Sequence, residues 1–570
     1  MPSSKAPRLK AAYTADGKII VGIDYGTTFT GASYSIDSWP GNARGIDTVS
    51  KSPSRIAYAA ENPRASRNLW GYQISSNMSA YAWTKLLLDN NTKLTEYDDP
   101  ALEATLGTGI LRLPAGKSAV DVAADYLTLV YQHIRHTLVR HITEEALKKT
   151  PLEFWFTVPA IWSDQAKHAT RTAAQRAGFW SSPERPHDRL YFISEPEAAA
   201  ITALRRYTSD STGGSITKVA PTLKFKELLT GVGGKCGSTS IDRNFHKFMS
   251  HRFGDAFDRL PMSTKGPGSA FMDKFEIIKK DFGSSTSYDI FALPLNMKLP
   301  HTTSPEYFDV EERLVQLTSD DMRTFFDPVV DKIINLLQGQ IAEARKLRGK
   351  KPINRIILVG GFGGSEYLCR RVRSTFGTTG KITVTIPPNP QTAIVQGAAL
   401  RGLEGIRSTT KLCRRHYGFE CAIDFREGLD DERNAWIDPF NDRKLVRGIM
   451  KWMISKGEKY AEEYKQTVYT RWTHRKCDSL IKSTNSYASE KMLAPERMDA
   501  DGVYKVGCIV VDFTEVDLSQ FPVVRKGGQR IYNLQYNIRV TFGAQDGLLK
   551  FEATCQGKII GKTSIEFTAT

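Results

Sequence analysis

The sequence predicts an α/β protein followed by a smaller β-rich domain. From Lys18 to about residue 408, short apolar runs bounded by glycine alternate with longer segments of helical periodicity. Beyond that point the pattern changes, and residues 532–567 alternate apolar and polar side chains between glycine-containing turns, as antiparallel strands do. The chain has 570 residues, 41% of them hydrophobic, enough for more than one core. We expect a disordered tail over 1–17, an α/β domain over 18–408 and a β-rich domain over 409–570.

Charge and cysteine content exclude several classes of protein. Lysine and arginine number 78 against 62 acidic residues, a net charge of +16, but the excess is spread along the chain without a basic stripe. We interpret it as solvated surface and expect no nucleic-acid partner. No apolar run reaches about eighteen residues and the first ten residues lack an apolar signal segment, so we expect no membrane association and no secretion. Seven cysteines without a Cys-x-x-Cys pair suit a reducing compartment, and the expected location is cytoplasmic.

The α/β part reads as strands that open into turns and helices. Residues 19–23 (Ile-Ile-Val-Gly-Ile) predict a buried strand that turns out through residues 26–31, and residues 119–139 carry apolar side chains at helical spacing. Residues 154–158 predict a second strand, with a helix following over about 164–177.

Two further strands complete this part. Residues 191–194 predict a strand that runs into an alanine-rich helix ending near Arg206. Residues 355–359 predict the last strong strand, which opens into a glycine-rich turn and a helix. Within the C-terminal part, residues 450–464 read as helical or as an irregular charged segment.

Three segments at strand ends carry candidate chemistry. Residues 24–28 (Asp-Tyr-Gly-Thr-Thr) offer consecutive backbone N–H groups and two hydroxyls to a phosphate, with Asp24 placed to hold a hydrated Mg²⁺. Residues 360–365 let the backbone approach a flat or anionic ligand at a helix N-terminus. Glu195 stands at a strand mouth, where it can orient water. Each also has a plain structural interpretation, as a turn, a strand–helix connection or an acidic helix start.

Taken together, the order of these motifs resembles the actin-like ATPase superfamily, and most closely the 70-kDa heat-shock chaperones. The similar segments are the first phosphate motif (23–28), the connecting segment (157–178), the Glu-Pro-x-Ala-Ala-Ala helix (194–200), a Gly-Gly turn before a helix (231–237), the adenosine motif (359–361) and the closing segment (389–399). The resemblance covers roughly 18–405. It implies an actin-like two-lobed ATPase fold with duplicated ribonuclease H-like lobes, over about 18–207 and 208–408, and ATP and Mg²⁺ as cofactors.

The resemblance also implies roles for individual residues. Asp24 matches the aspartate that holds Mg²⁺ through water, Lys85 falls near the catalytic lysine, and Glu195 matches a second acidic residue near the metal. The implied cofactor-binding residues are Gly26, Thr27 and Thr28 at the phosphates, Glu276, Lys279 and Lys280 on a helix that clamps ribose and base, and Gly360 and Gly361 under the adenosine.

The sequence departs from the family at its second phosphate motif, a buried strand followed by Asp-x-Gly-Gly-Gly-Thr-x-Asp. Here the helix that ends at residue 207 runs straight into a Ser- and Gly-rich stretch over 208–217, with no apolar strand before Asp210. One interpretation is a degenerate motif, with Asp210 as its first acid, Gly213-Gly214 as its loop and Thr217 in place of its second aspartate. The other is a deletion, which also explains the missing strand and which we favour.

Two smaller departures point the same way. Phe362 replaces a small polar residue in the adenosine turn, and Gln391 replaces an acidic residue in the closing segment. One lost preorganised contact to developing charge costs about 3 kcal/mol, or roughly 10²–10³ in rate. We therefore predict weak nucleotide binding and little or no hydrolysis.

The sequence thus predicts a divergent, ATP-binding, chaperone-type protein with weak or lost ATP hydrolysis, whose partners are unfolded client proteins and co-chaperones. A pseudo-ATPase scaffold that needs no nucleotide is the alternative. A small-molecule kinase of the same superfamily fits less well, because no catalytic aspartate for an acceptor pocket is evident. A mis-spliced gene model, in which the real protein keeps the missing strand, also stays open. The C-terminal part does not closely resemble the usual substrate-binding module, since it lacks an apolar linker and a long helical lid, but it resembles the divergent branch of the family, in which the β-domain is retained in altered form.

Overall fold

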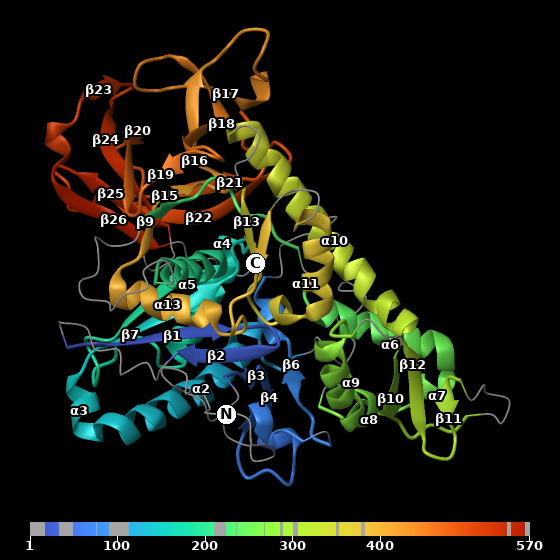
Figure 1. The fold of residues 1–570 in the computed structure, drawn as a ribbon. Coiled ribbons are helices and arrows are strands. Elements are labelled where there is room, and N and C mark those ends of the chain that lie inside the picture. The colour runs from blue at the N-terminus through green and yellow to red at the C-terminus, as the bar shows by residue number, and fades with distance from the viewer. Residues whose placement is uncertain are drawn as a thin grey trace. The chain divides into compact units, whose positions relative to one another are not determined.

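The computed structural model divides the chain into two compact units (Figure 1). Unit 1 contains the residues up to 223 together with 231–407, and unit 2 contains 224–230 together with 408–570. No helix in the part of the chain that the structure describes is both long and apolar enough to cross a membrane. The described residues are 17–33, 50–75, 77–89, 113–209, 224–234, 236–266, 268–285, 289–299, 306–348, 353–377, 382–543 and 549–564.

A five-stranded sheet in the order β3-β2-β1-β7-β8 organises the first part of unit 1. β1 (Ile19–Tyr25), β7 (Leu152–Val158) and β8 (Arg189–Ser194) are parallel, whereas β2 (Phe29–Ser33) and β3 (Ser52–Pro53) pair antiparallel. All seven residues of β1 are buried, as expected for a central strand covered on both faces. The three parallel strands end at one edge of the sheet, which is where open α/β sheets bind ligands.

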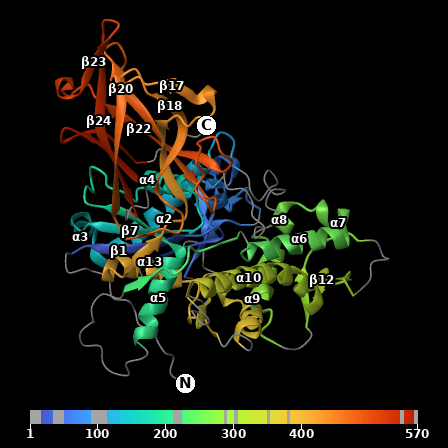
Figure 2. The same cartoon turned by 90° about the horizontal axis from the view of Figure 1, so that it is seen from above.

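Helices cover both faces of this sheet. α2 (Ala119–Ile142) and α4 (Asp164–Arg176) share one hydrophobic core with alternate residues of β1. The hydroxyl of Ser118 caps α2 by accepting from the Asp121 N–H. On the other face, α13 (Ala393–Glu404) packs against β1 and beside α5 (Glu195–Ser209), as both views show (Figures 1 and 2).

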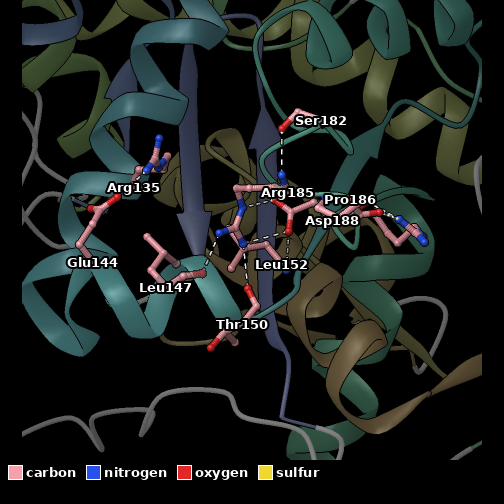
Figure 3. A network of polar contacts seen from close by, with 10 residues as sticks. Arg135, Glu144, Leu147, Thr150, Leu152, Ser182, Arg185, Pro186 and Asp188 are labelled. Atoms are coloured by element: carbon pink, nitrogen blue, oxygen red, sulfur yellow. Dashed lines mark hydrogen bonds and ion pairs between the residues drawn. The ribbon is translucent and has the colours of Figure 1, made fainter.

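A buried arginine fastens the start of β7 (Figure 3). Arg185 donates to both carboxylate oxygens of Asp188, at 2.5 and 2.9 Å, and to the carbonyl oxygens of Leu147 and Thr150. Asp188 in turn accepts from the backbone N–H of Leu152, the first residue of β7. The ion pair therefore satisfies the carbonyls at the end of α3 (Glu144–Lys149) and sets where β7 begins.

The segment between β3 and α2 forms a small satellite sheet. β4 (Arg55–Ala57) lies between β5 (Leu69–Trp70) and β6 (Tyr81–Ala82). The 3₁₀ helix η3 (Thr84–Leu88) follows directly and carries Lys85.

The second part of unit 1 is built on a core rich in phenylalanine. Phe245 of α6 (Thr239–Phe253) stacks on Phe275 of α9 (Ala270–Asp281), with ring centroids 3.9 Å apart. The remaining elements are the short helices α7 (Asp255–Asp258) and α8 (Met262–Lys265), the antiparallel strands β10 (Ile290–Pro294), β12 (Leu314–Thr318) and β11 (Phe308–Asp309), and the long helix α10 (Ser319–Arg348).

A two-stranded parallel sheet completes unit 1. β13 (Arg355–Ile357) pairs with β14 (Thr383–Thr385), and α11 (Glu366–Val372) shares a hydrophobic core with them and with α10. Within the described residues this sheet has two strands, whereas the sheet around β1 has five.

Unit 2 is a β-sheet structure. One sheet has the order β17-β18-β16-β21-β22, a second has β20-β24-β25-β26 with β23 beside β24, and a third pairs β9 and β19 with β15. Side chains of the first two sheets form one core. The bounds are β9 Lys224–Lys226, β15 Arg407–Leu412, β16 His416–Asp424, β17 Ala435–Ile437, β18 Lys444–Ile454, β19 Lys459–Tyr460, β20 Tyr464–Arg475, β21 Ile481–Ser489, β22 Val503–Asp512, β23 Val523–Lys526, β24 Gln529–Phe542, β25 Lys550–Cys555 and β26 Lys558–Ser564.

The helical interpretation of residues 450–464 is wrong, and the irregular, charged interpretation fits only the turns on either side of β19. β18 continues to Ile454, and β20 begins at Tyr464. Met450, Met453 and Ile454 are buried at a spacing that one face of a helix also shows, because β18 pairs with β16 through two irregularities in register. The shifts in register disturb the alternation of buried and exposed side chains that marks a strand, so the sequence pattern did not indicate β18.

Candidate functional site

The turn between β1 and β2 is tightly built. The Gly26 N–H donates to the Phe29 carbonyl oxygen, and a Cβ atom at Gly26 would lie 2.3 Å from that oxygen, so only glycine fits. Ser54 occupies two carbonyls of the turn: its N–H donates to Thr28 O, and its hydroxyl to Gly26 O. The half-buried residues Thr27 and Thr28 form the tip of the turn. Two carbonyls of the turn are thus occupied by Ser54, and the tip can offer N–H and hydroxyl donors to an anion.

Asp24 is buried just before this turn and accepts from two side-chain donors. Its Oδ1 accepts from the Thr157 hydroxyl at 2.7 Å, and its Oδ2 accepts from Lys51 Nζ at 2.6 Å. Burial by itself would raise the pKa of Asp24, but the ammonium groups of Lys51 and Lys85 outweigh that effect and hold the pKa below its usual value. Both oxygens of the carboxylate therefore have a donor from the protein.

Lys85 and Glu195 form a second ion pair at the same sheet edge. Lys85 Nζ lies 3.0 Å from Glu195 Oε1 and 5.2 Å from the centroid of the Trp162 ring. Glu195 follows directly on β8 as the first residue of α5. Because Asp24 also experiences the Lys85 charge, these groups form a charged quartet, defined here as Asp24, Lys51, Lys85 and Glu195. Its formal charges cancel.

Lys51 is the member of the charged quartet that sequence reasoning missed. It lies 27 positions from Asp24 along the chain, in a Ser-Lys-Ser stretch that carries no recognisable motif. The pairing follows from the sheet, because β3 brings the residue before Ser52 beside β2.

The glycine turn after β13 presents open backbone. Gly360 has a φ of +87°, which favours glycine, and its N–H donates to the Pro390 carbonyl oxygen at 2.7 Å. A Cβ atom at Gly361 would have no neighbour within 4 Å. Phe362 packs against both cores of this part of the unit, which gives its departure from the family pattern a structural role. Gly361 thus offers a surface on which a flat ligand can lie.

The three predicted residues of α9 differ in accessibility. Lys279 is buried and paired with Asp242 at 2.7 Å and with Glu276 at 2.5 Å, whereas Lys280 is largely exposed and lies 3.8 Å from Glu276. Burial lowers the pKa of Lys279, but the two carboxylates outweigh it and the pKa is raised. Lys279 therefore serves the interior of the protein, while Glu276 and Lys280 remain accessible to a ligand. Asp242 was not predicted, because it lies 37 positions away on α6.

The segment of the second phosphate motif lies outside the described residues; this includes Asp210, Gly213, Gly214 and Thr217. The chain is next described at β9, which belongs to unit 2. It continues in unit 1 at Gly231, and a Cβ atom at Gly233 would lie 2.8 Å from Ile161 Cγ2. The predicted Gly-Gly turn thus lies against the segment between β7 and α4.

The charged quartet does not fit the Mg²⁺ implied at Asp24. Lys51 Nζ already neutralises Asp24 at 2.6 Å, and a divalent cation at the same carboxylate would meet its positive charge. Glu195 is likewise paired with Lys85. Across the described residues, no group of three or more His, Cys, Asp or Glu side chains could hold a metal ion.

Known proteins resemble this chain at low identity. No protein-family model matches it. Human heat shock 70 kDa protein 12A is 22% identical over 89% of this chain and 87% of its own length. Human heat shock 70 kDa protein 12B is 23% identical over 70% of each. The chaperone protein HscA homolog of Rickettsia rickettsii (strain Sheila Smith) is 23% identical over 69% of this chain and 58% of its own length.

The chain is a divergent relative of the heat-shock 70 proteins. Its mixed α/β structure with several sheets agrees with that relationship. The similarity to the human 12A protein covers 89% of this chain, which is more than residues 18–405 make up. It therefore extends into unit 2. Motif order had indicated the resemblance over roughly 18–405, and the C-terminal part was expected to keep the β-domain of the family in altered form.

Proposed function

We propose that the chain is a nucleotide-binding protein of chaperone type, similar to heat-shock 70 proteins, in which ATP hydrolysis is weak or lost. The observation that carries the proposal is the tip of the β1–β2 turn, where Thr27 and Thr28 follow the constrained Gly26 beside the charged quartet. Donors at the carboxyl end of a parallel sheet suit phosphate oxygens. The open surface at Gly361 supports an adenosine position.

We further propose that unit 1 has the two-lobed actin-like fold, with lobes over about 18–207 and 208–408. The contact of α5 with α13 supports this, because it joins the helix after β8 to the last helix of the unit. A rotation of the lobes about such a contact is a two-state element that a phosphate ligand can bias.

Weak hydrolysis follows from how the acidic groups are engaged. Glu195 Oε1 is paired with Lys85, and both oxygens of Asp24 accept from protein donors, which makes these carboxylates weaker bases toward an attacking water. The likeness to proteins named as chaperones supports unfolded clients and co-chaperones as partners. None of the seven cysteines, all of which lie in the described residues, forms a disulfide, which supports a reducing compartment such as the cytoplasm.

Calorimetric titration of ATP into the full chain tests the proposal. Gly361→Arg fills the open surface without a steric conflict and should abolish binding, whereas Gly339→Arg adds the same charge at a second open glycine on α10 and should leave binding unchanged. Release of phosphate should be little above the background. If the folded wild-type chain binds no nucleotide with or without Mg²⁺, the nucleotide-independent scaffold replaces this proposal. The scaffold alternative is supported by the charged quartet, whose four charges pair with one another without a ligand.

A further inference from the structure

The position of Lys51 is specified by its surroundings. Gly31 lies directly opposite Asp24 in the β1–β2 pairing, and a Cβ atom there would lie 3.2 Å from Lys51 Cγ and 3.3 Å from Lys51 Cε. The aliphatic part of the Lys51 side chain therefore passes over Gly31, which has no side chain to obstruct it. The hydroxyl of Tyr72 donates to the Lys51 carbonyl oxygen and holds the backbone. Lys51 thus reaches Asp24 along a path that the sheet provides.

The ammonium group of Lys51 lies at the Asp24 carboxylate, where the resemblance implies a magnesium ion. Lys51 and Asp24 are both buried, and their charged atoms are 2.6 Å apart. A buried charge is tolerated where a partner neutralises it, and Lys51 does for Asp24 what a bound cation does for a carboxylate at a phosphate site. An ammonium has three N–H donors, so Lys51 retains donors after the bond to Asp24.

We propose that Lys51 is a built-in replacement for the divalent cation, so that this site binds the polyphosphate of a nucleotide without Mg²⁺. The inference rests on the proposed nucleotide binding and states how that site neutralises phosphate charge. The charged quartet is neutral with Lys51 in place, whereas the same site without it carries a net negative charge and repels phosphate. Lys51 therefore makes the sheet edge compatible with an anion.

The alternative is that Lys51 only stabilises the fold. A purely structural lysine would leave the metal requirement of binding unchanged when it is replaced. A lysine that stands in for the metal would, when removed, leave a carboxylate that a divalent cation can use. The dependence of binding on Mg²⁺ therefore distinguishes the two roles.

The test is titration of ATP into the full chain in EDTA and in excess Mg²⁺. We expect the wild-type affinity to agree within about twofold between the two conditions. Lys51→Met should weaken binding in EDTA by about tenfold or more, corresponding to one lost charged contact, and Mg²⁺ should restore part of it. Lys51→Arg keeps the charge and should retain binding in EDTA. Lys18→Met is the matched control, because Lys18 pairs with Glu153 beside the start of β1 at 2.6 Å.

Lys51→Met leaves Asp24 buried without its partner and can prevent folding. The double variant Asp24→Asn/Lys51→Met removes both charges and should fold, with equally weak binding in both conditions. Wild-type binding that requires Mg²⁺, or binding in EDTA that Lys51→Met leaves unchanged, would overturn the inference while the proposed function stands. Binding in neither condition would overturn the proposed function itself.

Discussion

A Cβ atom at Gly397 of α13 would lie 1.8 Å from the carbonyl oxygen of Ala198 in α5. The two helices therefore touch through their backbones at this point. α13 also approaches β1 closely, since a Cβ atom at Gly22 would lie 2.5 Å from the Val395 carbonyl oxygen. Because α5 starts at Glu195 and β1 carries Asp24, this packing sets where two members of the charged quartet lie.

Gly397→Ala should destabilise unit 1 by about 3 kcal/mol, because the methyl group meets backbone that cannot rotate away. Thermal and urea unfolding monitored by circular dichroism measure the change. Gly339→Ala is the matched control: Gly339 is exposed within α10 with no atom near its Cβ position, so alanine should be neutral or stabilise by up to about 1 kcal/mol. Equal effects of the two substitutions would contradict the close approach.

Arg185→Ala should destabilise the fold by about 3–5 kcal/mol, since it leaves Asp188 buried without its cation and removes one donor from each of two carbonyls. Chemical denaturation compared with the wild type measures this cost. Arg259→Ala breaks an ion pair with Asp255 whose side chains are 81% and 78% exposed, and it should change stability by less than about 0.5 kcal/mol. A small effect at Arg185 would show that the network of Figure 3 is dispensable.

Stability should fall as the pH is lowered from about 7 to 5, in part through His246. Burial, aided by the charge of Lys265, lowers the pKa of His246 from its ordinary 6.5 to about 4. The folded state therefore keeps this imidazole neutral, while the unfolded chain takes up a proton near pH 6.5. The stabilisation is present above that pH and is lost as the pH falls toward 4, by about 2 kcal/mol between pH 7 and pH 5.

His246→Phe should remove this part of the pH dependence, since the ring lies tilted against Phe257 with centroids 5.7 Å apart and needs no charge. Unfolding free energies of both proteins at pH 7 and pH 5 provide the comparison. If the stability of the variant depends on pH as strongly as that of the wild type, groups other than His246 cause the dependence.

One cysteine should react rapidly with a thiol reagent in the native protein. Cys477 is exposed, Cys421 and Cys508 are half-buried, and the other four are buried. Burial raises the pKa of Cys369 to about 11, which further suppresses its thiolate. Absorbance with a disulfide reagent should show one fast thiol, and seven in denaturant. Cys477→Ser should abolish the fast phase, and a fast phase that survives would place a second thiol at the surface.

Local patterns predicted much of unit 1. The sequence indicated the strands at 19–23, 154–158 and 191–194. Burial on one or both faces leaves a run or a regular spacing of apolar residues within about ten positions, which can be recognised without the structure. β18 was not visible, because its irregular register with β16 disturbs that period.

Among the candidate site residues, the sequence indicated Asp24, Lys85 and Glu195 through motif order, and the structure brings Lys85 and Glu195 into contact. Lys279 could not be assigned an interior role from the sequence, since its partner Asp242 lies on another helix. The role of Phe362 was equally hidden, because it depends on two cores that assemble from distant segments.

The sequence by itself determined the α/β pattern, the turns that need glycine and the relationship to the heat-shock 70 proteins, because each depends on neighbouring residues in a fixed order. Only the tertiary structure decided which charges meet. The ion pair of Asp24 with Lys51 spans 27 positions, and that of Lys279 with Asp242 spans 37. Such pairs have no period and no fixed spacing, so they arise when the sheet and helices pack and not before.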